Sequence, residues 1–174
     1  YEEEIEKEAS KGYRVLVFGN CEETPDGRAL RGKVTPLAYI MLANPIRKEA
    51  PQTFAYFEEQ GVEVKVISGD NPVTVSEVAK KAGIAGADDF VDAATLTTEE
   101  EIRQAVQKYT VFGRVTPSQK RQFVKALKSA GHTVAMTGDG VNDVLALKDA
   151  DCSIAMASGS DAAAQASQLV LLES

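Results

Sequence analysis

The sequence predicts an α/β fold in which a parallel sheet carries helices on both faces. Short apolar runs alternate with helical patterns along most of the 174 residues. Two of these runs end in small and polar residues, at Ile67-Ser68-Gly69-Asp70 and at Met136-Thr137-Gly138-Asp139, as strands of a parallel sheet do at a binding crevice. The chain is 44% hydrophobic, which is enough for one core of ordinary domain size.

The elements follow from this alternation, and the first 32 residues differ from the rest. We expect a helix over residues 1–11, a strand over 13–18 and a polar turn from Glu22 to Gly32. Strands are then expected near 36–43, 63–67, 89–91, 110–113, 133–136, 152–155 and 168–172. Helices are expected over 48–60, 72–83, 98–108, 117–130 and 143–149, with a small one from about 160. Pro117 suits the first turn of its helix.

The segment Thr137–Asp143 places two carboxylates and a carboxamide directly after an apolar strand. Mg²⁺ prefers hard oxygen ligands and needs only one or two protein carboxylates beside a phosphate. The segment therefore predicts a magnesium site. The alternative is a glycine-rich turn whose Asp and Asn side chains satisfy local backbone groups.

Two other segments supply the groups that a phosphate needs. Ser68 offers a hydroxyl at the end of one strand, and Lys120 offers a positive charge about one turn inside the helix that begins at Pro117. Right-handed crossovers would place Ser68, Lys120 and Asp139 at the same edge of the sheet.

Four motifs occur in a fixed order: Ile67–Asp70, Arg114–Lys120, Thr137–Asp143 and Ser153–Ser160. In this order they resemble the phosphorylation domain of P-type cation-transporting ATPases, which belongs to the haloacid dehalogenase superfamily. The resemblance covers roughly residues 40–172. It implies a Rossmann-like parallel sheet of the haloacid dehalogenase type, with ATP as substrate and Mg²⁺ as cofactor. It also implies that residues 1–32 are the tail of a nucleotide-binding domain and that residues 33–174 are the phosphorylation domain.

The resemblance assigns a role to each matching residue. Lys120, Asp139 and Asp143 are expected to be catalytic, with Asp139 and Asp143 at the metal. Phosphate binding is expected from four residues: Ser68, Gly69, Lys120 and Asn142. Arg114 is expected to reach the nucleotide, the alternative being a solvated arginine at a strand end. Asp70 is as well suited to cap the next helix as to serve interdomain signalling.

One essential motif of the family does not occur in these 174 residues. Its nucleophile is the aspartate of an Asp-Lys-Thr-Gly-Thr segment, and the similar Asp92–Thr97 lacks the lysine and the glycine. We interpret Asp92–Thr97 as a strand end and loop. Because covalent catalysis needs the missing carboxylate, the chain alone is expected to form no phosphoenzyme from ATP.

The nucleophile strand is central in the family, between the strands that here end at Ile67 and Met136. Its absence leaves three alternatives for the centre of the sheet. The two strands close up, a second copy of the chain fills the gap, or the missing strand comes from sequence outside these residues. Two departures are smaller. Asn44 stands where relatives carry aspartate, and Ser68 replaces the usual threonine.

Composition excludes several functions. A net charge of −7 argues against nucleic-acid binding, and no apolar stretch approaches the length of a membrane span. Cys21 and Cys152 lack metal-ligand spacing, and Cys152 is expected to be a buried free thiol in a strand. His132, the only histidine, is expected in a loop. The start at Tyr1 inside a helical pattern suggests a cut fragment.

Two functions of different class follow. The first is a cytoplasmic segment of a membrane cation pump, whose partners would be ATP, the other pump domains and a cation carried by an absent membrane domain. The resemblance leaves that cation open, with calcium and magnesium as candidates. The second is a free-standing soluble phosphatase of the same superfamily, although it too would need a nucleophile. A regulatory module that binds Mg²⁺ and phosphate is a third, non-enzymatic alternative.

Overall fold

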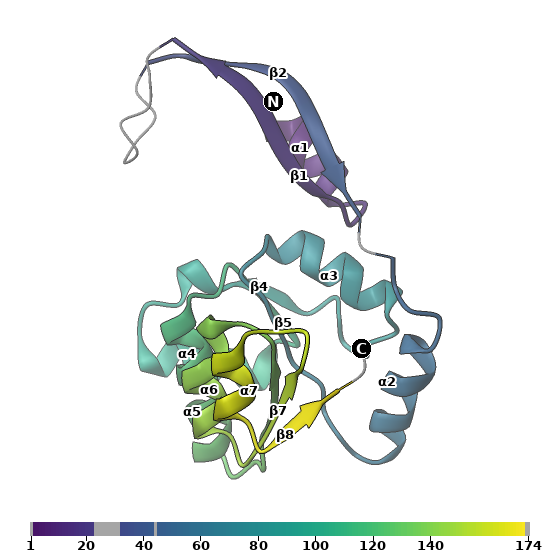
Figure 1. Ribbon diagram of the computed structural model, residues 1–174, viewed down its shortest axis with the longest axis vertical. Helices are drawn as coiled ribbons and strands as arrows, with labels where there is room; N and C mark the ends of the chain where they lie inside the picture. Colours follow the sequence, from purple (N-terminus) through teal and green to yellow (C-terminus); the bar gives the residue numbers. More distant parts are fainter. Residues whose placement is uncertain (1, 23–31, 44, 173–174) are drawn as a thin grey trace.

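The computed structural model describes residues 2–22, 32–43 and 45–172. The N-terminal part is a helix and a hairpin that extend away from the remainder of the chain (Figure 1). Helix α1 covers Glu2–Ala9, and strands β1 (Arg14–Cys21) and β2 (Val34–Leu42) pair antiparallel. This confirms the helix and strand expected at the start. The Glu22–Gly32 turn lies largely outside the described residues, and Asn44 lies outside them as well.

The remaining elements form the predicted α/β arrangement. The helices are α2 (Ala50–Glu59), α3 (Pro72–Lys81), α4 (Glu99–Lys108), α5 (Pro117–Ser129), α6 (Val144–Asp149) and α7 (Asp161–Ala166), with single 3₁₀ turns η1 (Ala93–Thr95) and η2 (Val141–Asp143). The strands are β3 (Val66–Ile67), β4 (Phe90–Asp92), β5 (Val111–Gly113), β6 (Ala135–Gly138), β7 (Cys152–Met156) and β8 (Leu169–Leu171). All expected elements are present, so the fold class is confirmed.

The strands form two parallel sheets where the sequence predicted one. Their orders are β3-β5-β4 and β6-β7-β8, and no ladder joins the two sheets within the described residues. Strands β3 and β6 are therefore both edge strands. Of the three alternatives, the one in which these two strands close up into direct pairing is not observed among the described residues. An unpaired edge leaves backbone donors and acceptors without ladder partners, which is the consequence foreseen from the missing central strand.

Several element ends also differ from the predictions. Strand β3 holds only Val66 and Ile67, because it pairs on one side alone, with the short strand β5. Asp143 ends η2 instead of beginning the last-but-one helix. Asp92–Thr97 is the end of β4 followed by η1, which confirms its interpretation as a strand end and loop.

Cys152 and His132, whose side chains could carry reactive chemistry, lie at ordinary structural positions. Cys152 is free, as expected, but half-buried where a buried thiol was expected, because buried and half-buried residues alternate along β7. His132 lies exposed in the loop after α5, as predicted, and its backbone amide donates to Leu127.

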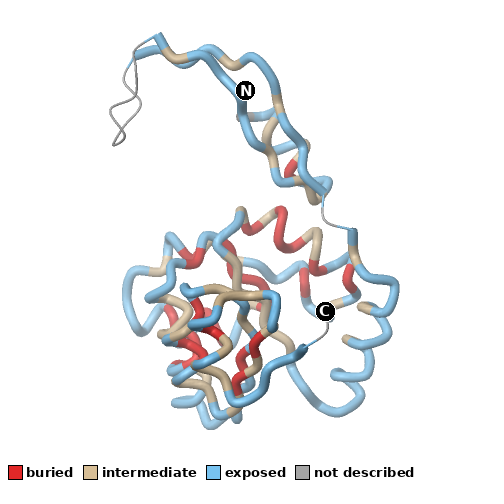
Figure 2. The backbone as a smooth tube through the Cα atoms, in the orientation of Figure 1, coloured by how far each residue is buried: buried red, intermediate tan, exposed pale blue. Residues whose placement is uncertain are grey.

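The hydrophobic core lies in the α/β part, and the hairpin is mostly exposed (Figure 2). One cluster joins α4, α5 and β5, and within it the rings of Phe112 and Phe123 lie 4.8 Å apart and tilted, both almost fully buried. A second cluster joins α5, α6, β6, β7 and α7. Leu127 of α5 packs against both clusters, so α5 is the element that connects the two sheets. No helix among the described residues is long and apolar enough to cross a membrane.

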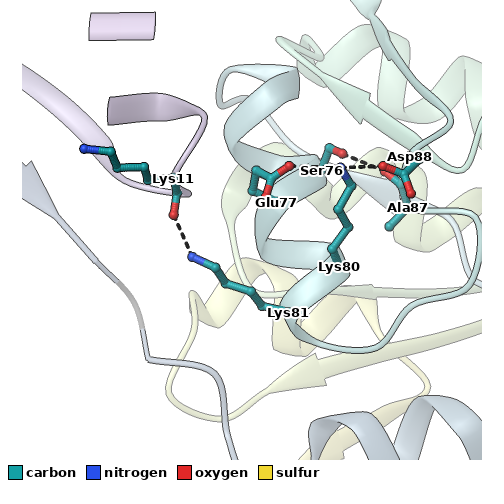
Figure 3. A network of polar contacts seen from close by, with 7 residues as sticks. All are labelled: Lys11, Ser76, Glu77, Lys80, Lys81, Ala87 and Asp88. Carbon is teal, nitrogen blue, oxygen red and sulfur yellow. Dashed lines mark hydrogen bonds and ion pairs between the residues drawn. The ribbon is translucent and has the colours of Figure 1, made fainter. Parts of the chain in front are cut away.

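Helix α3 makes polar contacts with the hairpin part at both of its ends. Near its C-terminus, Lys81 Nζ donates to the Lys11 carbonyl at 2.6 Å (Figure 3). Just before its N-terminus, Asp70 lies 3.6 Å from Arg14 Nη1. On another side of α3, Lys80 pairs with Glu77 and Asp88, and Ser76 Oγ donates to Ala87 at 2.7 Å. These contacts join the hairpin and the β4 loop to one helix.

Helix α5 is also tied by charge to the elements beside it. Arg121 Nε donates to Asp149 at 2.6 Å, which is the main reason that the pKa of Asp149 lies below its ordinary value of 3.8. The backbone amide of Val134 donates to Asp151 at 3.0 Å and lowers the pKa of that carboxyl, with a smaller contribution from Lys128. Both carboxylates are therefore more easily ionised in the folded state than in the unfolded state.

The first prediction concerns Gly113 on the central strand β5. A Cβ atom there would lie 2.4 Å from Pro72 Cα and N at the start of α3, so Gly113→Ala forces backbone to move. We expect it to lower the free energy of unfolding by about 3 kcal/mol, the upper end of the usual cost of overpacking. Urea unfolding measures this. Gly69→Ala is the control, because its nearest neighbour would be 3.8 Å away, and an equal loss in both variants would contradict the packing argument.

The second prediction concerns acid stability. Because the folded pKa of Asp149 and Asp151 lies below the unfolded value, each carboxylate stabilises the fold above about pH 4 and loses this effect as the pH falls further. Asp149→Asn should therefore flatten the decline in unfolding free energy between about pH 5 and pH 2. Glu59→Gln, an exposed carboxylate at the end of α2, is the control. Parallel stability curves for wild type and Asp149→Asn would contradict the prediction.

Candidate functional site

Asp143 is folded back onto the end of β6. Gly138, the last residue of β6, allows this, because a Cβ there would lie 2.6 Å from the Asp143 Cβ. Asp143 Oδ2 accepts a hydrogen bond from the Gly140 amide at 3.1 Å, and the residue is 5% exposed. Gly138 is thus required by close approach, and the last carboxylate of the motif points inward.

Lys120 reaches this buried carboxylate from helix α5. Its Nζ lies 2.6 Å from Asp143 Oδ1, and the two side chains are 15% and 7% exposed. The helix start is fixed by Thr116, which caps it, and by Pro117 in its first turn. Two motifs that are 23 positions apart in the sequence therefore meet at one buried ion pair.

Asp139 and Asn142 lie on the solvent side of the same turn, and both are exposed. The Asp139 backbone is held in place, because its carbonyl accepts from the Ser160 amide at 2.7 Å. Gly159 is needed for this contact, since a Cβ there would lie 2.5 Å from the Asp139 carbonyl oxygen. The Asp139 carboxylate makes no ion pair or hydrogen bond with other described residues.

Ser68 lies at the end of β3, fixed by its backbone to the strand and loop beside it. Its amide donates to Phe112 and its carbonyl accepts from Val115, each at 2.9 Å. Its Oγ accepts from the Asp70 amide at 3.1 Å, which leaves the hydroxyl proton available to donate. Gly69 is exposed, and a Cβ there would meet only ordinary contact distances.

Arg114 has an unusual backbone and a side chain that is already engaged. Its φ of +52° is the one positive value at a non-glycine residue among those described, and its amide donates to Asp70 at 2.7 Å. Its Nη1 lies 2.6 Å from Asp92 Oδ2 at the end of β4. Half of the side chain is exposed. The arginine thus pairs with a neighbouring strand end and stays partly exposed to solvent, and its expected contact with a nucleotide remains a prediction.

The structure therefore brings the predicted residues together in three groups: Lys120 with Asp143, Ser68 and Gly69 beside Arg114, and Asp139 beside Gly159 and Ser160. No direct hydrogen bond joins these groups to one another within the described part of the chain. The sequence did not indicate a role at the site for two residues that contact its middle segment, Asp92 and Gln119. A signal existed for Gln119, since Thr-x-x-Gln is the pattern of a capping box.

The donor set fits Mg²⁺ in part. Asp139 offers an exposed carboxylate on a fixed backbone, whereas the Asp143 carboxylate is neutralised by Lys120. No group of three or more His, Cys, Asp or Glu side chains in the described ranges is arranged to hold a metal. Mg²⁺ does not need such a group when a substrate phosphate supplies further oxygens.

The third prediction concerns the Lys120–Asp143 pair. Removing one partner leaves a buried charge alone, so Lys120→Met and Asp143→Asn should each lower the unfolding free energy by about 3 kcal/mol. The double variant should lose less than the two single losses together, which a double-mutant cycle in urea measures. Arg103 and Glu100 on α4 form the control pair, since both are largely exposed. Their coupling should be below about 1 kcal/mol. Equal couplings at the two pairs would contradict the role of burial.

Comparison with known proteins identifies the family. The family model of haloacid dehalogenase-like hydrolases matches residues 2–151. The chain is 49% identical over 172 residues to the calcium-transporting ATPase CtpE of Mycolicibacterium smegmatis, covering 98% of this chain and 22% of that protein. It is 46% identical to the probable cation-transporting ATPase exp7 of Streptococcus pneumoniae, again covering 98% of this chain and 22% of the relative.

A solved structure agrees with the fold. It is the catalytic domain of the CPx-ATPase CopB-B, with a TM-score of 0.57 and 23% identity over 80% of this chain and 45% of that one. The chain spans about a fifth of the length of the curated relatives it matches. The resemblance to P-type cation-transporting ATPases that the ordered motifs indicated is thus confirmed, and the chain belongs to the haloacid dehalogenase-like hydrolase family.

Proposed function

We propose that this chain is part of the cytoplasmic catalytic region of a P-type cation-transporting ATPase, and that it supplies phosphate and metal ligands for phosphoryl transfer from ATP. The observation that carries the proposal is the buried contact between Lys120 and Asp143, which joins two of the four ordered motifs. The names of the similar proteins, which are calcium-transporting and cation-transporting ATPases, support it. Transport itself would need membrane segments beyond the part of the chain that is described.

The N-terminal helix and hairpin are proposed to be the end of a nucleotide-binding domain. The sequence suggested a boundary at residues 32 and 33, but β1 and β2 lie on either side of it and pair from Arg14–Leu42 to Cys21–Val34. We therefore place the boundary after Leu42. The remainder would be the phosphorylation domain, with the other domains of the same pump and ATP as its partners.

Phosphate recognition would use groups from both sheets. The free proton of the Ser68 hydroxyl and the exposed Gly69 amide would donate to phosphoryl oxygens, and Lys120 would offset their charge. Lys120 has three donors and spends one on Asp143, so two stay available. Asn142 would complete the donors on the side of β6, and Arg114 would reach the nucleotide by leaving Asp92.

Mg²⁺ would be held by Asp139, because that carboxylate is exposed while its backbone is fixed by Ser160. When bound there, the ion would supply positive charge beside a phosphoryl group. Asp143 would orient water through its free lone pairs while remaining paired with Lys120. Among Lys120, Asp139 and Asp143, one positive and two negative side chains leave a net negative site. An anionic phosphate should therefore bind well only together with a divalent cation.

The fourth prediction tests this site in the chain itself. Inorganic phosphate, titrated by calorimetry, should bind more tightly with Mg²⁺ present than with the chelator EDTA. Asp139→Asn should weaken Mg²⁺ binding by more than about tenfold, since even outer-shell partners of metal sites cost 10–100-fold. Asp143→Asn should weaken it less, because its carboxylate is already neutralised by Lys120.

The control for this titration is Asp88→Asn, an exposed carboxylate on the loop before β4. It should leave phosphate and Mg²⁺ binding unchanged. Lys120→Met should abolish phosphate binding. Phosphate binding that survives Lys120→Met, or a larger loss of Mg²⁺ at Asp143 than at Asp139, would contradict the proposed site.

A further inference from the structure

The turn after β4 contacts the segment Arg114–Lys120 of the candidate site, which its sequence does not indicate. Asp92 ends β4 and caps η1, with its Oδ1 accepting from the Ala94 amide at 2.9 Å. Its other oxygen binds Arg114, which begins the segment that leads to Lys120. Near the other end of that segment, Gln119 also contacts this turn. The residues that superficially resemble the missing nucleophile motif are thus a support for the segment Arg114–Lys120.

The Gln119 carboxamide uses all of its hydrogen-bonding capacity. Its Nε2 donates to the carbonyls of Ala93 and Leu96 at 2.7 and 3.2 Å, so it spans η1. Its Oε1 accepts from the amide and the hydroxyl of Thr116, each at 3.1 Å. A carboxamide offers two donor protons and two acceptor lone pairs, and all four are engaged here. The reverse orientation would set the oxygen against two carbonyls, so the network determines which way the amide points.

The place of Gln119 in α5 connects this network to Lys120. The two residues are adjacent in the first turn, and the Lys120 amide donates to the Thr116 carbonyl at 3.1 Å. Thr116 is therefore a common partner of Gln119 and Lys120. A long lysine side chain carries much rotamer entropy, and it makes a buried contact at 2.6 Å only if its helix turn is well fixed. Gln119 fixes that turn against η1, which follows β4 of the first sheet, while Asp143 lies in η2, which follows β6 of the second.

We propose that Gln119 is the positioning residue for Lys120. Its carboxamide holds the first turn of α5 against η1, so that the Lys120 ammonium group is directed at Asp143 and at the phosphate position beside it. This inference rests on the proposed function only for the ligand at Lys120. The geometry of the ammonium group can be tested without any ligand.

The competing account is that Gln119 serves only as the second half of a helix cap. Gln119→Glu separates the two accounts. A glutamate at this position keeps the oxygen that accepts from Thr116, so the capping box remains. It loses the two protons that reach Ala93 and Leu96, and it sets a carboxylate against their carbonyls. Gln119→Met removes both functions at similar side-chain length.

The experiment is NMR of the lysine ammonium groups in ¹⁵N-labelled chain. A buried and paired ammonium exchanges its protons slowly enough to be seen, whereas exposed ones do not. Lys65, which pairs with Glu63 and donates to Tyr109, should also give a signal, so Lys120→Met is used to assign that of Lys120. We expect Gln119→Glu and Gln119→Met to shift or broaden this signal alike, although Gln119→Glu keeps the cap and the fold. Gln104→Met is the matched control, since among the described residues the Gln104 carboxamide hydrogen-bonds to Glu100 alone, at 3.0 Å on the exposed face of α4.

A second measurement uses inorganic phosphate with Mg²⁺ as the probe. Its affinity should fall about tenfold in both Gln119 variants, at the lower end of what loss of a supporting hydrogen bond costs a bound site. An unchanged Lys120 signal in Gln119→Glu would overturn the positioning role. If wild type binds no phosphate, the proposed function fails, yet the ammonium signal still decides whether Gln119 positions Lys120.

Discussion

Helix α5 is the element on which the two halves of the α/β part depend. The sheets β3-β5-β4 and β6-β7-β8 share no ladder in the described residues, so backbone hydrogen bonds do not join them. Helix α5 joins them through apolar contacts instead. Phe123 lies in the cluster of the first sheet, Val124 in that of the second, and Leu127 packs against both. Neighbouring positions on one helix thus face different sheets, which fixes the helix between them. The ion pairs of α5 with Asp149 and Asp151 add to its attachment to the half that contains the second sheet.

The alternation of apolar runs and helical patterns was sufficient to predict every helix and strand of the α/β part, because each strand is a short apolar run between polar turns. The division into two sheets was not predictable from periodicity alone. Ladder formation depends on which strands are neighbours, and residues such as Val66 and Ala135 carry no local signal that one of their sides lacks a partner. The expectation of a gap between these strands came instead from the missing motif, and it left three alternatives open.

The candidate site shows the same division between local and tertiary information. The residue types and spacing of Thr137–Asp143 were enough to predict an oxygen-rich turn, since glycines and carboxylates after a strand have few other uses. They were enough to rank Asp139 ahead of Asp143 as a metal ligand, but not to predict that Asp143 pairs with Lys120. Asp143 is buried because Lys120, which is far away in the sequence, lies over it. Asp139 is exposed. The pairing of Arg114 with Asp92 was missed for the same reason. Strand neighbours β4 and β5 bring Asp92 opposite Gly113, the residue that precedes Arg114.

The residues of the proposed site come from both sheets and lie next to the two unpaired edge strands, β3 and β6. Ser68 follows β3, Asp139 follows β6, and Lys120 lies in the first turn of the helix that packs against both sheets. A ligand that contacts Ser68 and Asp139 together would hold the two sheets in one relative position, which no ladder does among the described residues. The exact position of Lys120 then matters more than it would in a continuous sheet, because both halves pack against α5. The four hydrogen bonds of Gln119 act in the first turn of that helix, directly beside Lys120, where a displacement of the turn would also displace the ammonium group.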